Sequence, residues 1–164
     1  MKTPRFKSTI LLGLVTLWSG SIALAANISG TYADKGSMLS EASSEVSFHA
    51  LLKLQLSPHV GVLDHADTAT VVLTDLDGWI EIITYTESGT ENSRLRWGPR
   101  NGVSHENGAT VFRISQSRDV FYTFMLSSAA DGTALEMKIY KVTPSALGPG
   151  ANPIGTYFFV KTEA

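Results

Sequence analysis

The sequence contains no cysteine among its 164 residues. This absence excludes a disulfide framework, a thiolate metal site, a thiol nucleophile and a lipid-modified cysteine. Charged residues are also few, at 17% of the chain, and the formal net charge is −2. The chain therefore has neither the basic excess that follows a nucleic-acid backbone nor the charge runs that favour disorder.

Sequence motifs that mark common catalytic sites are absent too. We find no Gly-x-Ser-x-Gly elbow, no Ser-x-x-Lys pair, no His-Glu-x-x-His and no phosphate-binding glycine loop. Some enzymes have no such motif, so an enzymatic function stays an alternative, but the absence of these motifs favours a non-catalytic protein. It predicts no cofactor.

Residues 1–25 have the pattern of a secretory signal peptide. Three basic residues form the positive start of this segment, Lys2, Arg5 and Lys7. An apolar core follows at residues 10–18, and Ala23-Leu24-Ala25 provides the small-x-small cleavage pattern. A membrane anchor needs about 20 apolar residues, which this core does not reach. We therefore expect cleavage after Ala25 and no membrane insertion of the mature chain.

Residues 26–164 are enough for a single domain of ordinary size. Disulfides are common in proteins of the eukaryotic secretory route, whereas an exported chain without cysteine is ordinary in bacteria. We therefore expect a periplasmic or secreted protein, bacterial in origin.

Period-two alternation and turn residues dominate this domain. The pattern predicts strands at residues 28–32, 68–75, 79–86, 92–97, 110–115, 120–126, 135–139 and 154–160. Two dipeptides are typical of tight hairpin turns, Asp77-Gly78 and Asp131-Gly132. The run at residues 120–126 is almost continuously apolar, which predicts burial on both faces.

The clearest alternation lies at residues 45–56. One face would carry Val46, Phe48, Ala50, Leu52, Leu54 and Leu56, and the other Glu45, Ser47, His49, Lys53 and Gln55. Leu51 is the one exception. This pattern predicts a long half-buried strand. We expect no helix of about ten residues or more, although residues 37–42 fit one helical turn capped by Ser37.

These elements predict an all-β fold of about eight or nine strands. Because parallel strands need crossovers of a dozen or more residues, the short connections favour an antiparallel meander. The two ends of the domain resemble each other, with Ile28-Ser29-Gly30-Thr31-Tyr32 against Ile154-Gly155-Thr156-Tyr157. We expect these first and last strands to pair, which favours a small closed barrel, with a β-sandwich as the alternative.

The segment Gly30-Thr31-Tyr32 resembles the Gly-x-Trp pattern that opens the first strand of lipocalin-like and avidin-like barrels. Tyrosine replaces tryptophan here, and the resemblance covers only these few residues. It implies a barrel shape, and no binding residue is carried over from it.

One loop gathers four residues that could bind a metal ion, His59, Asp64, His65 and Asp67. Imidazole and carboxylate groups are suitable ligands for zinc and other divalent ions. The spacing matches no recognised metal motif, however, so we interpret this segment as a solvated loop and predict no metal.

Two further clusters lie on the predicted sheet. Arg94 and Arg96 share a strand face, which we interpret as a solvent face paired with glutamates, Glu81, Glu87 and Glu91. An anion-binding patch is the alternative, with three more arginines near it, Arg100, Arg113 and Arg118. We expect the Glu81 side chain to be exposed to solvent and the side chains of Ile80 and Ile82 to be buried.

Aromatic residues are the best candidates for ligand contacts. Trp79, Tyr85 and Trp97 could line the mouth of a barrel and stack on an apolar ligand, although filling the core is the commoner role of such residues. The leading hypothesis is a non-catalytic binding protein for a small apolar or amphipathic ligand. The alternatives are a protein-interaction module that uses loops or a sheet edge, such as an inhibitor or assembly subunit, and an enzyme with a barrel pocket.

Overall fold

The computed structural model describes residues 27–55, 67–76, 78–144 and 150–162. It contains ten strands: β1 (Gly30–Met38), β2 (Glu41–Ser47), β3 (Thr68–Leu76), β4 (Trp79–Thr86), β5 (Glu91–Trp97), β6 (Ser104–Glu106), β7 (Ala109–Ser115), β8 (Phe121–Ser128), β9 (Ala134–Thr143) and β10 (Gly150–Thr162). Two short helices complete the set, α1 (Phe48–Gln55) and the 3₁₀ helix η1 (Pro99–Asn101). No helix in these described ranges is long and apolar enough to cross a bilayer.

All strands belong to one sheet, in the order β5-β4-β3-β1-β10-β9-β8-β7-β6, with β2 paired to β1 beside this path. Every strand pair is antiparallel. The all-β antiparallel prediction is confirmed. Tight turns explain the topology, because glycines at positive φ, such as Gly78 (φ 75°) and Gly132 (φ 73°), let neighbouring strands reverse direction.

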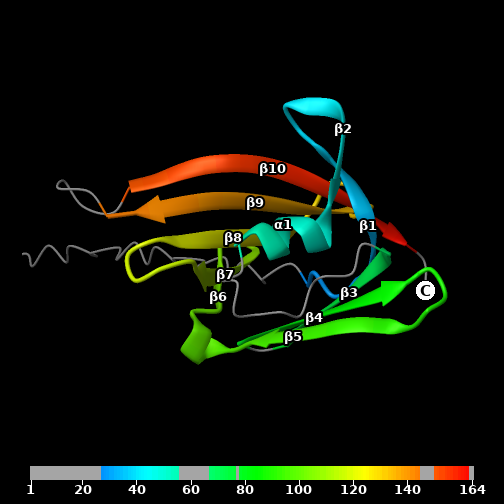
Figure 1. Ribbon diagram of the computed structural model, residues 1–164, viewed down its shortest axis with the longest axis horizontal. Helices are drawn as coiled ribbons and strands as arrows, with labels where there is room; N and C mark the ends of the chain where they lie inside the picture. The colour runs from blue at the N-terminus through cyan, green and yellow to red at the C-terminus, as the bar shows by residue number, and fades with distance from the viewer. Residues whose placement is uncertain (1–26, 56–66, 77, 145–149, 163–164) are drawn as a thin grey trace, which may run out of the picture.

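The sheet is strongly curved, as Figure 1 shows. Strands β8, β9 and β10 lie on one side of the molecule, β3, β4 and β5 lie on the other, and α1 lies between them. The sheet ends at β5 and β6, and the described residues include no backbone pairing between these two strands. The hydrogen-bonded ladder is therefore not closed, and we call the gap between β5 and β6 the seam.

The predicted pairing of the first and last strands is confirmed. Thr31 lies opposite Thr162, and Met38 lies opposite Tyr157. β1 also pairs with β2 and with β3, so it is the strand through which the two sides of the sheet are connected. Gly36 sits in this crowded strand, where a Cβ would lie 2.3 Å from the Phe158 carbonyl oxygen. Only glycine fits such a close backbone approach.

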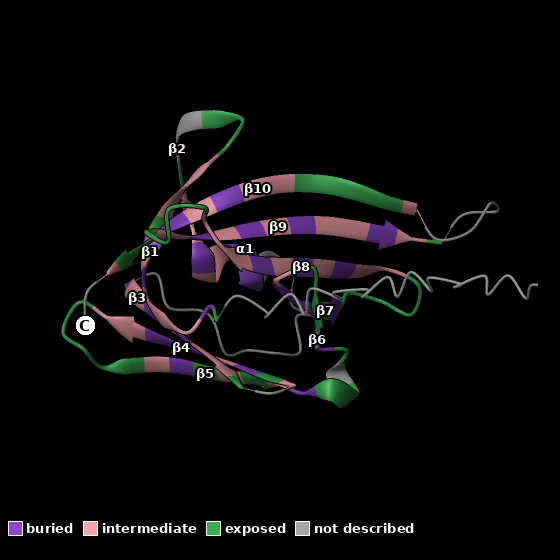
Figure 2. Cartoon of the chain, turned by 180° about the vertical axis from the view of Figure 1, so that it is seen from behind, coloured by how far each residue is buried: buried purple, intermediate pink, exposed green. Residues whose placement is uncertain are grey.

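One hydrophobic core fills the space inside the curved sheet. Figure 2 shows buried residues recurring along the strands of both sides. Its largest fully buried side chains come from both sides and from α1: Phe48, Phe112, Phe124, Phe159, Ile28, Leu52, Leu73, Ile80, Ile82, Leu126, Leu135 and Met137. The alternation within strands such as β9 reflects period-two geometry, because every second side chain points inward.

The predicted strand at residues 45–56 is wrong. The strand β2 ends at Ser47, and α1 begins at Phe48. Phe48, Leu51 and Leu52 are buried, and their spacing of three and four residues is that of one helix face. Leu51, the exception in the strand pattern, is thus explained. Ser47 caps this helix, because its Oγ accepts a hydrogen bond from the Ala50 amide (3.2 Å).

Two smaller predictions are also wrong. Residues 37–42 form no helical turn, since β1 continues to Met38 and β2 starts at Glu41 after a tight turn. β8 is not buried on both faces, because buried Tyr122, Phe124 and Leu126 alternate with partly exposed neighbours. A single curved sheet has only one core side, so the outer face of β8 keeps contact with solvent.

Candidate functional site

The three aromatic residues predicted as ligand contacts do not form one cluster. Trp97 lies opposite Ile80, which is fully buried, so both point to the core side of the sheet. Trp79 lies opposite exposed Leu76 on the outer face and is itself 45% exposed. Tyr85 lies six residues farther along β4, which is about 20 Å in a strand. The structure therefore brings Trp79 and Trp97 to one end of β4 and β5, on opposite faces, and leaves Tyr85 at the other end.

Trp97 begins a column of stacked rings at the seam. Its ring stacks on Phe112 of β7, with centroids 5.1 Å apart, and Phe112 stacks on Phe124 of β8 at 5.0 Å. Both phenylalanines have no exposed surface, whereas Trp97 is partly exposed. The column therefore leads from the core to the seam, and it links β5 to β7 through side chains where no ladder joins them.

A buried carboxylate also bridges the seam. Asp75 at the end of β3, with 6% of its side chain exposed, lies 3.0 Å from Nε2 of His105 on β6. The hydroxyl of buried Thr110 on β7 donates to the other carboxylate oxygen. The Asp75 amide donates to Ser29 Oγ at 2.9 Å, next to the start of β1. One residue thus ties β3 to three other segments.

A second buried carboxylate holds α1. Asp34 on β1 is 1% exposed and accepts hydrogen bonds from the Ser47 hydroxyl (2.8 Å) and the His49 amide (2.9 Å). Nδ1 of His49 lies 2.9 Å from the same carboxylate and 2.7 Å from Ser47 Oγ. His49 was expected on a solvent face, but 13% of its side chain is exposed and it contacts Asp34. This cluster fixes the start of the helix.

The arginines of β5 form ion pairs, as predicted. Glu81 lies between Arg94 (3.1 Å) and Arg96 (3.0 Å), with 12% of its side chain exposed. Arg94 also binds Glu91 at 2.9 Å, and this hydrogen bond lowers the pKa of Glu91 and raises the pKa of Arg94. Glu81 is less exposed to solvent than expected, but Ile80 and Ile82 are buried as predicted. The guanidinium groups are occupied by carboxylates, which supports the solvent-face interpretation.

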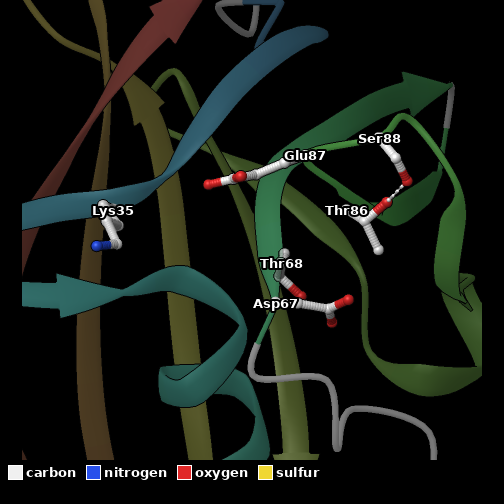
Figure 3. A pocket seen from close by; sticks show the side chains of 6 residues that line it. All are labelled: Lys35, Asp67, Thr68, Thr86, Glu87 and Ser88. Carbon is white, nitrogen blue, oxygen red and sulfur yellow. Dashed lines mark hydrogen bonds between the residues drawn. The ribbon is translucent and has the colours of Figure 1, made fainter.

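A polar hollow of about 510 Å³ opens between β1, β3 and the β4–β5 turn. Figure 3 shows its lining side chains, Lys35, Asp67, Thr68, Thr86, Glu87 and Ser88. Lys35 is paired with Glu45 at 3.0 Å, and Thr86 shares a hydrogen bond with Ser88 at 2.8 Å. Its mixed charges and mutually bonded hydroxyls resemble an ordinary solvated surface.

An apolar hollow of about 400 Å³ lies where the β1–β2 turn meets β9 and β10. Its apolar lining consists of Met38, Leu39, Tyr140, Pro153 and Ile154. Leu39 is 68% exposed and Ile154 is 37% exposed, so two of the large exposed apolar side chains converge here. A third hollow, of about 570 Å³, lies between the end of β10 and the β8–β9 turn. Exposed apolar side chains that gather around a concave surface are typical of binding sites.

The loop considered for a metal lies mostly outside the described residues. His59, Asp64 and His65 are not described, and Asp67 lines the polar hollow. Within the described part of the chain, no group of three or more histidine or acidic side chains could hold a metal ion.

Sequence reasoning missed the two buried aspartates and their partners. For Asp34, one signal was present, since Ser47 precedes a run of good helix formers, which is typical of a helix N-cap. No local signal marks Asp75, because its partners His105 and Thr110 are brought to it only by the curvature of the sheet. The apolar hollow was missed for the same reason.

Comparison with known proteins adds no assignment to this geometry: no family model, no curated protein and no solved structure matches the chain.

Proposed function

We propose that this protein is an exported, non-catalytic binding protein that takes a small apolar or amphipathic ligand in the hollow between the β1–β2 turn and β10. The observation that carries the proposal is the convergence of exposed Leu39 and Ile154 on one concave surface. Its volume of about 400 Å³ lies in the range of small-molecule sites. The Tyr140 side chain adds an aromatic body with a polar tip, which suits an amphipathic ligand.

Export and shape belong to the same proposal. The signal-peptide pattern of residues 1–25 supports release into the periplasm or medium. A barrel-like shell, interrupted at the seam, is supported by the curvature of the sheet and by the contact of Trp97 with Phe112 across its two ends. The two end strands of the sheet, β5 and β6, follow each other in the chain, and a barrel-like shell explains this more simply than a sandwich does. Trp79, Tyr85 and Trp97 do not line this hollow, and their role as ligand contacts remains a prediction.

The test is binding of the uncharged fluorescent dye N-phenyl-1-naphthylamine to the purified protein. Leu39→Asp and Ile154→Asp each place a charge in the hollow, and each should lower the dye affinity at least about tenfold, the cost of burying an unpaired charge beside an apolar ligand. Leu76→Asp is the matched control, because Leu76 is 52% exposed on β3, away from the hollow. Equal losses in all three variants, or no dye binding in the parent protein, would contradict the proposal.

A protein partner is the second candidate, and the strand edge beside the same hollow favours it. Residues 150–155 of β10 pair with β9 on one side and have no described strand on the other. Strand addition to such an edge is a known mode of peptide recognition. Pro153 lacks an amide hydrogen, however, and a bulge follows it, and both features oppose strand addition. Native mass spectrometry of protein from its own host separates the candidates, since a bound small molecule supports the first and a protein partner the second.

A further inference from the structure

The hydroxyl of Tyr157 lies beside the apolar hollow at β10. Tyr157 is buried, with 4% of its surface exposed, and it lies opposite Met38 in the ladder of β1 and β10. Its hydroxyl reaches back along β10, because a Cβ on Gly155 would lie 2.6 Å from the hydroxyl oxygen and 3.1 Å from Met38 Cε. Gly155 and Met38 both line the hollow. The hydroxyl is therefore at the wall of the hollow, where Gly155 has no side chain to cover it.

Three tyrosines of the described chain are buried, and only two of them have a partner for the hydroxyl. Tyr32 donates to the Ile28 carbonyl at 2.8 Å, and Tyr122 donates to Gln116 Oε1 at 3.2 Å. The Tyr157 hydroxyl has no hydrogen-bond partner among the residues that the structure describes. Burial raises the pKa of Tyr157 above its ordinary value, so the hydroxyl keeps its proton at neutral pH and is a donor. Because buried polar groups are almost always hydrogen-bonded, this exception indicates an acceptor that the chain itself does not supply.

The lining of the hollow restricts the chemistry of this acceptor. No charged side chain is among the described residues that line it. A carboxylate placed there would lose its hydration without a cation to offset the cost. An uncharged carbonyl oxygen accepts a hydrogen bond from a phenol hydroxyl at much lower cost of desolvation. The hollow thus favours a neutral acceptor beside an apolar body.

We propose that the ligand of this hollow is an apolar molecule with an uncharged carbonyl group, and that the Tyr157 hydroxyl donates a hydrogen bond to this carbonyl. The apolar body would lie against Leu39 and Ile154, which are the exposed apolar side chains of the lining. A hydrocarbon of the same shape would leave the hydroxyl unpaired, so Tyr157 selects against it. This inference rests on the proposed function, because it concerns the same hollow, and it narrows the class of ligand.

Three small probes of nearly the same shape separate these chemical classes. Acetophenone carries an uncharged carbonyl, α-methylstyrene has a methylene group in place of the oxygen, and benzoate carries a carboxylate. Titration of the purified protein with each probe, followed by NMR, gives three dissociation constants. We expect acetophenone to bind and benzoate to bind at least about tenfold more weakly, because the charge of benzoate finds no partner in the hollow.

Tyr157→Phe removes the hydroxyl and keeps the ring. It should weaken acetophenone binding about fivefold, the effect of one lost hydrogen bond, and change α-methylstyrene binding less than about twofold. Tyr32→Phe is the matched control. Tyr32 is also buried, but its hydroxyl already donates to the Ile28 carbonyl and it does not line the hollow. This control should change the affinity for either probe less than about twofold.

The carbonyl carbon of ¹³C-labelled acetophenone reports the hydrogen bond directly. Its resonance moves downfield when the oxygen accepts a hydrogen bond. Acetophenone bound to the parent protein should therefore resonate downfield of acetophenone dissolved in hexane, and in Tyr157→Phe the bound resonance should move back toward the hexane value. The measurement on the parent protein decides the question even if Tyr157→Phe does not fold.

Failure of this inference can be told apart from failure of the proposed function. A hexane-like resonance in the parent protein, or equal losses of acetophenone and α-methylstyrene binding in Tyr157→Phe, would reject the hydrogen bond. Benzoate binding as tight as that of acetophenone would reject an uncharged ligand. In each case the proposed function stands if Leu39→Asp still weakens the binding of both neutral probes. No binding of either neutral probe, or binding that Leu39→Asp and Ile154→Asp leave unchanged, would reject the proposed function and this inference together.

Discussion

Asp34 and Asp75 are the two buried aspartates that the structure describes in contact with histidine, and each also accepts a hydrogen bond from a hydroxyl group. Their side chains are 2% and 6% exposed. The partners of Asp34 lie 13 and 15 residues away in the chain, at the junction of β2 and α1. The partners of Asp75 lie 30 and 35 residues away, on the other side of the seam.

The two aspartates accept similar hydrogen bonds but have different structural roles. Asp34 accepts an additional hydrogen bond from the amide of His49, so it completes the first turn of α1. Phe48 and Leu52 of this helix are fully buried, and loss of Asp34 therefore disturbs the core itself. Asp75 joins surfaces that are already formed, so its loss affects mainly the contact between them. We expect removal of Asp34 to destabilise the whole domain, and removal of Asp75 to destabilise mainly the contact of β3 with β6 and β7.

The largest effect is expected for Asp34→Ala. It removes the acceptor of the Ser47 hydroxyl and of the His49 amide, which are partly buried, and weakens the start of α1, which should lower the free energy of unfolding by about 3–5 kcal/mol. Urea unfolding followed by circular dichroism measures this loss. A cost no larger than that of Asp75→Ala would break the distinction between the two aspartates.

Asp75→Ala should lower the free energy of unfolding less, by about 1–3 kcal/mol, because it leaves one buried donor, the Thr110 hydroxyl, beside the partly exposed His105, and it removes no contact at the start of a helix. Hydrogen exchange should increase in β6 and in the part of β7 that faces it, while β9 remains protected. Uniform loss of protection across the sheet would show that Asp75 supports the whole fold and would remove the local role assigned to it.

Ser47→Ala removes the cap of α1 together with one of the hydrogen bonds that Asp34 accepts, while the Asp34 carboxylate itself stays in place. The Ser47 hydroxyl is the acceptor for the Ala50 amide, and loss of such a cap lowers the free energy of unfolding by about 1 kcal/mol. Ser47→Asp restores an acceptor at this position but brings a second carboxylate close to Asp34. A stability of Ser47→Asp below that of Ser47→Ala would show that a second carboxylate beside Asp34 costs more than the restored cap contributes.

The smallest effect concerns Tyr32, which supports the chain next to the Asp75 partner Ser29. Its hydroxyl donates to the Ile28 carbonyl at 2.8 Å, and burial raises its pKa above the ordinary value of 10.0. Because the unfolded chain loses this proton first, stability is unaffected below pH 10.0 and falls as the pH rises above it. Tyr32→Phe should reduce this alkaline loss, measured by urea unfolding at increasing pH. Burial also raises the pKa of Tyr157. The loss of stability at alkaline pH that remains in Tyr32→Phe is therefore expected to come from Tyr157.

Much of the fold could be predicted because it depends on local patterns. Turn glycines and alternating side chains placed β3, β4, β5 and β7 within a residue or so of their observed bounds. The helix α1 was missed because Phe48, Ala50 and Leu52 fit period two as well as a helix does. What decides between the two is Asp34, which accepts hydrogen bonds at the start of α1 from a neighbouring strand. Tertiary contacts of this kind override local pattern.

The candidate sites could be predicted much less well. Trp97 was predicted as a ligand contact, which stays a prediction, and its stacking partner Phe112 comes from another strand, β7, that no local pattern connects to it. The apolar hollow combines the β1–β2 turn with β9 and β10, and Leu39 was not singled out by any pattern. Contacts between distant segments depend on curvature, and sequence patterns carry little information about curvature.

The pairing of β1 with β10 has a kinetic consequence. Thr31 and Thr162 meet in the ladder, so the step that connects the two sides of the sheet closes a loop of nearly the whole described chain. Closing long loops costs entropy before any contact offsets it, and folds rich in such contacts form slowly. A growing chain cannot complete its core until its last strand is present. Slow folding of this kind fits the export proposed above, because a chain that folds slowly stays unfolded for longer while it crosses a membrane.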